Sequence, residues 1–308
     1  MSSLFAFPGQ GAQRPGMLHD LPDEPLVRAC LEEASDALGE SVLALDSRAA
    51  LESTRAVQLC LLLAGVASAR SLMQRSPAPD YVAGLSIGAY PAAVIAGALH
   101  FADAVRLVAL RGELMQRAYP SGYGMTALIG LDQGSVERLV QTSAEAVYLA
   151  NINADNQFVI AGSDHAMAAL AERALACGAS AARRLAMSVP SHCALLDQPA
   201  AELAEAFAGI SLRRPQLRYL SASSARQVSD PEALRDDLAG NMCRTVNWHG
   251  TVGNAYERGV RLLVELPPGA VLSRLARRTF NPGTVVACQD ARSDTLDALL
   301  RQEVNSSR

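Results

Sequence analysis

A serine with glycines two positions before and two positions after it lies in the segment GLSIG (84–88). Such glycines let a strand, a sharp turn and a helix approach one another without side-chain clashes. The apolar segment Tyr81–Ala83 precedes it, and an uncharged helical pattern follows. A helix N-terminus beside the turn would stabilise negative charge. The pattern predicts that Ser86 is a nucleophile, although a glycine-rich turn without chemistry has the same letters.

A serine nucleophile needs a base, and histidine is the usual one. His192 lies in LAMSVPSHCALL (185–196), a segment without any other charged side chain. It follows a predicted strand and precedes a predicted helix, as active-site loop residues often do. The alternative is a hydrogen-bonded core histidine. We favour His192 as the base over the four other histidines, which are His19, His100, His165 and His249.

A buried arginine is the third candidate. On the predicted helix Ala102–Ala118, the neighbours of Arg111 one turn away are Leu107, Leu114 and Met115. A guanidinium in an apolar stripe needs an anion, because an unpaired buried charge is costly. Arg111 is therefore predicted to clamp a substrate carboxylate with two hydrogen bonds. The alternatives are that it reaches solvent or pairs with a carboxylate of the protein.

The first strand, Leu4–Phe7, ends in the segment FPGQGAQ (7–13). This segment is either an ordinary turn at a strand end or a source of backbone N–H groups for an oxyanion. The second possibility requires that the first strand lie beside the strand before Ser86.

The elements that must position these residues alternate between strands and helices. Strands are expected at Leu4–Phe7 and Tyr81–Ala83, and helices at Leu26–Leu38, Ala56–Met73 and Ala102–Ala118. This order predicts an α/β fold with a parallel sheet covered on both faces. The pattern resumes near the C-terminus with helices at 195–207, 234–242 and 251–258 and strands at 217–221 and 261–265.

The middle of the chain has a different pattern, in the order β-α-β-β-α-β. The expected strands are Met125–Ile129, Val147–Asn151, Gln157–Ala161 and Arg183–Val189, with a turn at 153–156 and helices at 133–142 and 164–177. This is the order of a ferredoxin-like unit. We therefore expect a large domain formed by residues 1–122 and 191–308, and a small ferredoxin-like insertion at 123–190.

Composition excludes several functions. All 27 basic residues of the 308 are arginine, so a phosphate-binding P-loop lysine and a lysine Schiff base are both impossible. A net charge of −4 gives no indication of nucleic-acid binding. The six cysteines have no metal-site spacing and predict reduced, mostly buried thiols, no metal and a cytoplasmic location. The uncharged stretch 81–99 contains three glycines and Pro91, so no membrane span is expected there.

Taken together, three segments resemble the malonyl-CoA:acyl carrier protein transacylase family. They are FPGQGAQ (7–13), the elbow and following helices GLSIGAYPAAVIAGALHFADAVRLVALRGELMQ (84–116), and SVPSHCALL (188–196). The resemblance covers most of the chain. It implies a large domain similar to the α/β-hydrolases with a ferredoxin-like insertion, which agrees with the order of elements above.

The resemblance also implies roles for individual residues. Ser86 would carry the acyl group, His192 would be its base, and Arg111 would hold the malonyl carboxylate. The backbone N–H groups of Gln10 and Ile87 would form the oxyanion hole. No bound cofactor is implied: the substrate is malonyl-CoA, and the acceptor is the prosthetic-group thiol of an acyl carrier protein.

Some positions depart from the bacterial fatty-acid-synthesis pattern. Leu85 replaces a histidine and Ala89 a glutamate, and Asn241 falls where a glutamine orients the histidine through its main-chain carbonyl. These variants are similar to the epsilon subunit of malonate decarboxylase, which implies the carrier subunit of that system as the partner. The transacylase of fatty-acid synthesis is the alternative.

Three further alternatives stay open. A serine esterase of the α/β-hydrolase type is disfavoured, because its histidine lies near the end of the chain, whereas 116 residues follow His192. A patatin-like lipase would leave His192 without a role. A scaffold that docks carrier proteins would leave Ser86, His192 and Arg111 unexplained.

Overall fold

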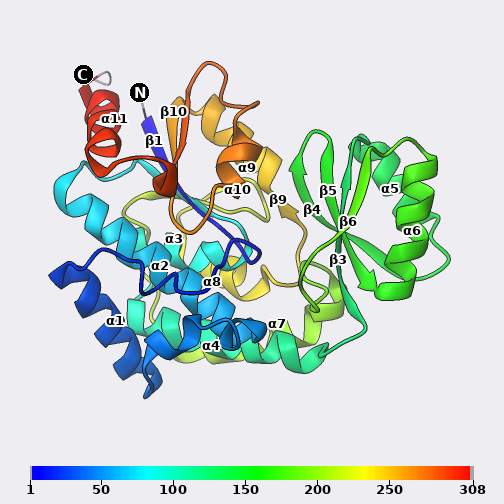
Figure 1. Ribbon diagram of the computed structural model, residues 1–308, viewed down its shortest axis with the longest axis horizontal. Helices are drawn as coiled ribbons and strands as arrows, with labels where there is room; N and C mark the ends of the chain where they lie inside the picture. The colour runs from blue at the N-terminus through cyan, green and yellow to red at the C-terminus, as the bar shows by residue number, and fades with distance from the viewer. Residues whose placement is uncertain (1, 306–308) are drawn as a thin grey trace.

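Two β-sheets organise the structure, a computed structural model that describes residues 2–305 (Figure 1). The larger sheet has the strand order β11-β10-β1-β2-β7-β8, and every neighbouring pair is parallel except β7 and β8. Its strands are β1 (Ser2–Phe7), β2 (Tyr81–Gly84), β7 (Arg218–Leu220), β8 (Gln227–Val228), β10 (Val260–Glu265) and β11 (Thr284–Ala287). The α/β class with a parallel sheet is confirmed.

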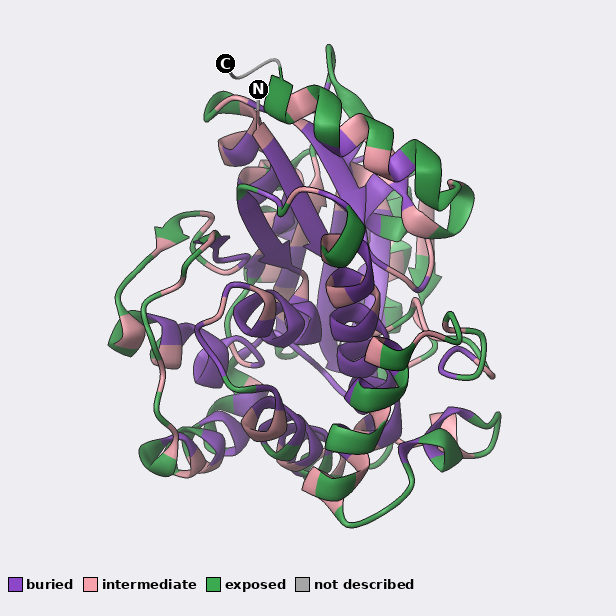
Figure 2. Cartoon of the chain, turned by 90° about the vertical axis from the view of Figure 1, so that its left-hand side faces the viewer, coloured by how far each residue is buried: buried purple, intermediate pink, exposed green. Residues whose placement is uncertain are grey.

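Helices cover both faces of this sheet. Successive side chains of its buried strands point to opposite faces, so both faces are apolar and both must be covered. Phe5 and Phe7 of β1 pack into one core, and Leu4 and Ala6 pack into the other. Figure 2 shows the central strands as buried and the outer helix surfaces as exposed. The first core receives α1 (Pro25–Leu38), α2 (Thr54–Arg75), α3 (Ala89–Ile95), α4 (Phe101–Ala118), α7 (Asp197–Ala206), α8 (Pro231–Gly240) and α11 (Ser293–Asn305); the second receives α9 (Trp248–Glu257) and α10 (Val271–Ala276).

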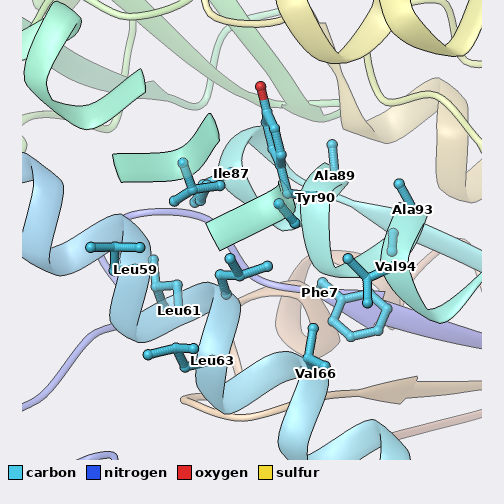
Figure 3. Close-up of a cluster of buried hydrophobic side chains, with 14 of the residues drawn as sticks. Phe7, Leu59, Leu61, Leu63, Val66, Ile87, Ala89, Tyr90, Ala93 and Val94 are labelled. Atoms are coloured by element: carbon cyan, nitrogen blue, oxygen red, sulfur yellow. The ribbon is translucent and has the colours of Figure 1, made fainter. Parts of the chain in front are cut away.

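The predicted buried helix is α2. By length and composition it could cross a membrane, with a mean hydropathy of 1.6, but 83% of its apolar window is buried inside the protein. Figure 3 shows Leu59, Leu61, Leu63 and Val66 of this helix in the core that supports the segment after β2, next to labelled residues such as Ile87. The apolar character of α2 is therefore that of a core helix.

The smaller sheet has the strand order β6-β3-β5-β4-β9. Its first four strands are antiparallel neighbours in the spatial order of a ferredoxin-like unit, with α5 (Gln133–Gln141) and α6 (Asp164–Ala176) packed on the outer face (Figure 1). The strands are β3 (Tyr123–Ile129), β4 (Val147–Ala154), β5 (Gln157–Ser163), β6 (Ala181–Arg184) and β9 (Val246–Asn247). The last strand comes from the C-terminal part of the chain and pairs in parallel with β4.

Two local predictions are wrong. The expected strand Arg183–Val189 ends at Arg184, whose guanidinium donates to the carbonyls of Leu185 and Met187, so these carbonyls bond to a side chain rather than to a neighbouring strand. The expected turn at 153–156 is shorter, because Ala154 pairs with Gln157 and extends β4 by three residues beyond Asn151. Both errors concern segments that later prove to line the functional cavity.

Short 3-10 helices complete the chain. Only one of them, η3 (Ser86–Gly88), carries a candidate functional residue. The others are η1 (Val42–Asp46), η2 (Ala50–Glu52), η4 (Ala194–Leu196), η5 (Phe207–Gly209) and η6 (Cys288–Asp290). Of the six cysteines, which are all free, Cys30, Cys60 and Cys193 are buried and Cys177 is exposed, so half rather than most are buried.

Candidate active site

Ser86 is the first residue of η3, at the sharp turn that follows β2, as the glycine pattern predicts. Its φ is +56°, a left-handed conformation that is unfavourable for a residue with a side chain. The flanking glycines are necessary, because a Cβ on Gly84 would lie 1.9 Å from the carbonyl of Gly88. A Cβ on Gly88 would lie 2.2 Å from the carbonyl oxygen of Phe7. The turn therefore requires glycine at both positions.

The first strand lies directly beside this turn. Strands β1 and β2 are parallel neighbours, and the N–H of Leu85 donates to the carbonyl of Phe7 at 3.0 Å. The loop after Phe7 consequently reaches the serine, and Gln10, Ser86 and Ile87 all line one cavity of about 530 Å³. Pro91 is tolerated because it is the third residue of α3. In the first turn of a helix the backbone N–H groups have no intrahelical acceptor, so a proline there removes no hydrogen bond.

His192 lines the same cavity from the loop after the small sheet. Its φ is +65°, and its N–H donates to the carbonyl of Met242 at 2.6 Å. The ring Nδ1 lies 2.7 Å from the carbonyl oxygen of Asn241 and must donate to it, because a carbonyl only accepts. This hydrogen bond leaves Nε2 as the nitrogen that can take up a proton.

Burial and, as the second cause, the positive charge of Arg111 together lower the pKa of His192 to about 4. The hydrogen bond to the Asn241 carbonyl opposes these effects by favouring the charged ring. The ring is therefore neutral near pH 7 and available as a proton acceptor.

Arg111 is completely buried on α4. Its Nη1 donates to Oε1 of Gln58 at 2.7 Å, and its Nη2 donates to Oδ1 of Asn241 at 3.0 Å and to Oγ of Ser86 at 3.3 Å. Its Nε has no hydrogen-bond partner. Within residues 2–305 no carboxylate forms an ion pair with it, so its charge is solvated only by amides and a hydroxyl.

Desolvation lowers the pKa of Arg111 to about 10, which still leaves it protonated near pH 7. Both alternatives stated above for Arg111, solvent exposure and an ion pair with the protein, are excluded within the described residues. A buried cation beside a candidate nucleophile can bind the anionic group of a ligand.

The structure brings all six predicted residues together. Ser86, Ile87, Gln10 and His192 line the cavity, Arg111 contacts Ser86, and Asn241 contacts both Arg111 and His192. Among the hydrogen bonds of the described residues, none joins Ser86 directly to His192. Such bonds are often long before a ligand is bound.

Two functional contacts were not predicted from the sequence. One is Gln58 on α2, the only amide side chain in the apolar run 56–67, which is the signal that points to it. The other is the side chain of Asn241, which was expected to act through its main chain alone. Its Nδ2 donates to the carbonyl of Ser86 at 3.3 Å while its Oδ1 accepts from Arg111, so it ties the guanidinium to the turn.

Comparison with known proteins identifies the family. Residues 4–306 match the family described as acyl transferase domain. The chain belongs to this family. It is 38% identical over 294 residues to the malonyl CoA-acyl carrier protein transacylase of Escherichia coli, covering 93% of this chain and 95% of that protein, and 30% identical to the Bacillus subtilis protein of the same name, covering 98% of each.

Comparison with solved structures indicates the same family. An acyl carrier protein S-malonyltransferase from Vibrio cholerae superposes with a TM-score of 0.90 at 36% identity, covering 97% of this chain and 100% of that one. A malonyl-transacylase solved in complex with a type II PKS acyl-carrier protein superposes with a TM-score of 0.87 at 39% identity, covering 93% and 94%. The chain is therefore an acyltransferase, which favours transfer over the esterase, lipase and scaffold alternatives.

In the part of the chain that the structure describes, no group of three or more His, Cys, Asp or Glu side chains is placed to hold a metal ion. The arrangement instead offers a hydroxyl, a neutral imidazole and a buried cation around one cavity.

We expect His192 to destabilise the acyltransferase at acid pH. Its pKa is about 4 in the folded state and about 6.5 in the unfolded state, so the unfolded chain binds more protons between these values and the free energy of unfolding falls as the pH drops through this window. When the pH is lowered from about 7 to about 4.5, the free energy of unfolding should fall by roughly 2 kcal/mol more for the wild type than for His192→Gln. Urea denaturation at both pH values measures this, with His249→Gln, an exposed position, as control. Equal losses in wild type and His192→Gln would contradict the assignment.

Proposed function

We propose that this acyltransferase moves a malonyl group from malonyl-CoA to the thiol of an acyl carrier protein, through an ester on Ser86. The observation that carries the proposal is the buried guanidinium of Arg111, which contacts Ser86 and has no carboxylate partner in the described structure. A malonyl group presents a carboxylate two carbons from its thioester carbonyl. The carboxylate would pair with Arg111 while the thioester lies at Ser86.

The names of the relatives support the same substrate, because the proteins from Escherichia coli and Bacillus subtilis are both malonyl CoA-acyl carrier protein transacylases. An acetyl group lacks the carboxylate and would leave Arg111 uncompensated. Arg111 therefore selects acyl groups that end in a carboxylate, and its planar fork suits two hydrogen bonds to that group.

The first half-reaction forms the acyl-enzyme. His192 takes the proton from Ser86 through Nε2 as the hydroxyl oxygen attacks the thioester carbonyl. The N–H groups of Gln10 and Ile87 stabilise the oxyanion of the tetrahedral intermediate. The intermediate collapses with cleavage of the C–S bond, His192 returns the proton to the departing sulfur, and CoA leaves as the free thiol.

The second half-reaction uses the same groups in reverse. The carrier thiol gives its proton to His192 and attacks the malonyl ester. The C–O bond to Ser86 then breaks, and His192 reprotonates the serine. A carbonyl, that of Asn241, orients the imidazole in place of the carboxylate of a catalytic triad.

The identity of the carrier is a separate question. The relatives are named for an acyl carrier protein and not for malonate decarboxylase, which supports the alternative stated above, the transacylase of fatty-acid synthesis. Leu85 and Ala89 in the elbow are the observation that favours the carrier subunit of malonate decarboxylase. We propose the carrier of fatty-acid synthesis, and a cytoplasmic location that suits six free cysteines.

A carrier assay tests this choice. We expect kcat/KM for malonyl transfer to be at least roughly tenfold higher with the holo-carrier of fatty-acid synthesis than with the carrier subunit of malonate decarboxylase. Both carriers are assayed at matched concentrations with one malonyl-CoA stock, and CoA release is followed. The opposite preference would assign the chain to malonate decarboxylation.

Ser86→Ala tests the acyl-enzyme. Without the hydroxyl no ester can form, so incubation with malonyl-CoA should leave the protein mass unchanged, whereas the wild type gains one malonyl group. Ser191→Ala is the matched control, because Ser191 lines the same cavity but lies outside the elbow. A malonyl adduct on Ser86→Ala, seen by intact-mass spectrometry, would disprove the assignment.

Arg111→Ala tests the selectivity of the enzyme for malonyl over acetyl groups. The lost charge-assisted hydrogen bonds predict that the ratio of kcat/KM for malonyl-CoA to that for acetyl-CoA falls roughly tenfold to a hundredfold. A general loss of folded enzyme would lower both kcat/KM values by the same factor and would therefore leave the ratio unchanged. An unchanged ratio would show that Arg111 does not contact the malonyl carboxylate.

A further inference from the structure

A buried carboxylate lies on the helix that leads to Asn241. Asp237 belongs to α8, is only 7% exposed and lies outside the described lining of the active-site cavity. Its two oxygens accept hydrogen bonds from two different hydroxyl groups, that of Tyr219 at 2.9 Å and that of Ser221 at 2.5 Å. Burial raises the pKa of Asp237, and the two hydroxyl groups oppose this shift because they stabilise the charged form. This group has no part in the acyl-transfer steps described above.

The hydroxyl groups around Asp237 are arranged for a side chain that only accepts. Ser221 Oγ already accepts from the backbone N–H groups of Ser223 and Ser224, at 3.2 and 3.1 Å. Its own hydrogen is therefore the one that points to Asp237. Tyr219 is fully buried, and its hydroxyl donates to the second carboxylate oxygen. Three apolar side chains in place of this cluster would avoid the cost of burying a carboxylate, so the geometry that the cluster imposes explains it better than stability does.

Asp237 is one helical turn before Asn241. Asn241 directly follows the last residue of α8 and keeps helical backbone angles, with φ −63° and ψ −24°. Four helical residues span only about 6 Å, so a displacement of Asp237 is passed on to Asn241. A second phenol holds the same turn: the hydroxyl of Tyr90, on the helix after the elbow, donates to the carbonyl of Leu238 at 3.0 Å. Two hydrogen-bonded contacts from different elements therefore fix the end of α8.

The cluster joins α8 to the strand beside the nucleophile. Tyr219 belongs to β7, which pairs in parallel with β2, and Ser86 follows the end of β2 by two residues. At the other end of the connection, the carbonyl of Asn241 lies 2.7 Å from Nδ1 of His192. A continuous set of contacts thus runs from the strand that carries the serine, through Asp237 and the last turn of α8, to the imidazole.

We propose that Asp237 is a positioning residue for the base of the reaction. Its two hydrogen bonds hold the end of α8 against β7 and the segment that follows it, and so keep the Asn241 carbonyl on Nδ1 of His192. Nε2 then remains the nitrogen available to Ser86. This inference rests on the proposed function, since it concerns the base of the proposed acyl transfer. Asp237 acts through Asn241 and touches no reacting atom.

The experiment measures single-turnover acylation by malonyl-CoA, with the malonyl-enzyme quantified by rapid quench and intact-mass spectrometry. For Asp237→Ala, the maximal rate constant of acylation should fall by about fivefold to tenfold, as expected when one hydrogen bond of the reactive arrangement is lost. The half-saturating concentration should stay within about twofold, because Gln58 still holds Arg111. Glu232→Ala is the matched control: it lies on the same helix with its side chain 75% exposed, and it should acylate like the wild type.

Asp237→Asn separates positioning from charge and from folding. Its oxygen can accept from Ser221 and its amide can donate to the hydroxyl oxygen of Tyr219, so its rate constant should stay within about threefold of the wild type. A folding defect would reduce the amount of enzyme that can be acylated, but not the rate constant of the fraction that reacts. A wild-type rate constant for Asp237→Ala, or equal losses in Asp237→Asn and Asp237→Ala, would overturn the positioning role.

A spectroscopic measurement separates this inference from the proposed function. Nitrogen NMR of histidine-labelled enzyme reports the tautomer of His192, whose signal is identified by its absence from His192→Gln. We expect the Nδ1–H tautomer in the wild type and in Glu232→Ala, and a mixture with the Nε2–H tautomer in Asp237→Ala. If the tautomer changes in this way but malonyl-CoA leaves no acyl group on the wild type, the proposed function fails and the positioning role stands. If malonyl-CoA acylates the wild type but Asp237→Ala keeps the wild-type tautomer, the positioning role alone fails.

Discussion

The buried guanidinium of Arg111 joins the segments of the site. It links α4, which carries it, to Gln58 on α2, to Ser86 on the elbow and to Asn241 after α8. A charge in an apolar core is tolerated only with such polar contacts, so these segments must stay in register with one another. No carboxylate within residues 2–305 balances the charge, and apolar packing at this position would stabilise the fold better. This arrangement supports the proposed role of Arg111 in binding an anionic group of the substrate.

The same charge contributes, after burial, to the lowered pKa of His192. Desolvation and Arg111 both disfavour a second cation in the cavity, which keeps His192 neutral near pH 7. Its Nδ1 is fixed by the Asn241 carbonyl, so a single residue positions the imidazole through its main chain and the guanidinium through its side chain. Arg111 and His192 are consequently coupled both electrostatically and through their shared contacts with Asn241.

Functional residues could be predicted from the sequence where their role depends on the spacing of nearby residues. The elbow needs glycine at fixed offsets, and the helical spacing of Arg111 predicts a buried cation, so both could be identified without a structure. Gln58 and the side chain of Asn241 could not be, because each depends on contacts between segments far apart in the chain. The error at 183–189 has the same origin: Arg184 bonds to carbonyls that the pattern of β-prone residues does not reveal.

The coupling between Arg111 and His192 would give the proposed substrate a part in catalysis. When a malonyl carboxylate pairs with Arg111, it offsets the positive charge that, after burial, is the second cause of the lowered pKa of His192, so we expect that pKa to rise. A base with a higher pKa accepts the Ser86 proton more readily. An acetyl group brings no carboxylate and leaves the imidazole weakly basic. Discrimination between the two acyl groups would then appear in the rate of acylation as well as in binding, because the carboxylate that is recognised also activates the base.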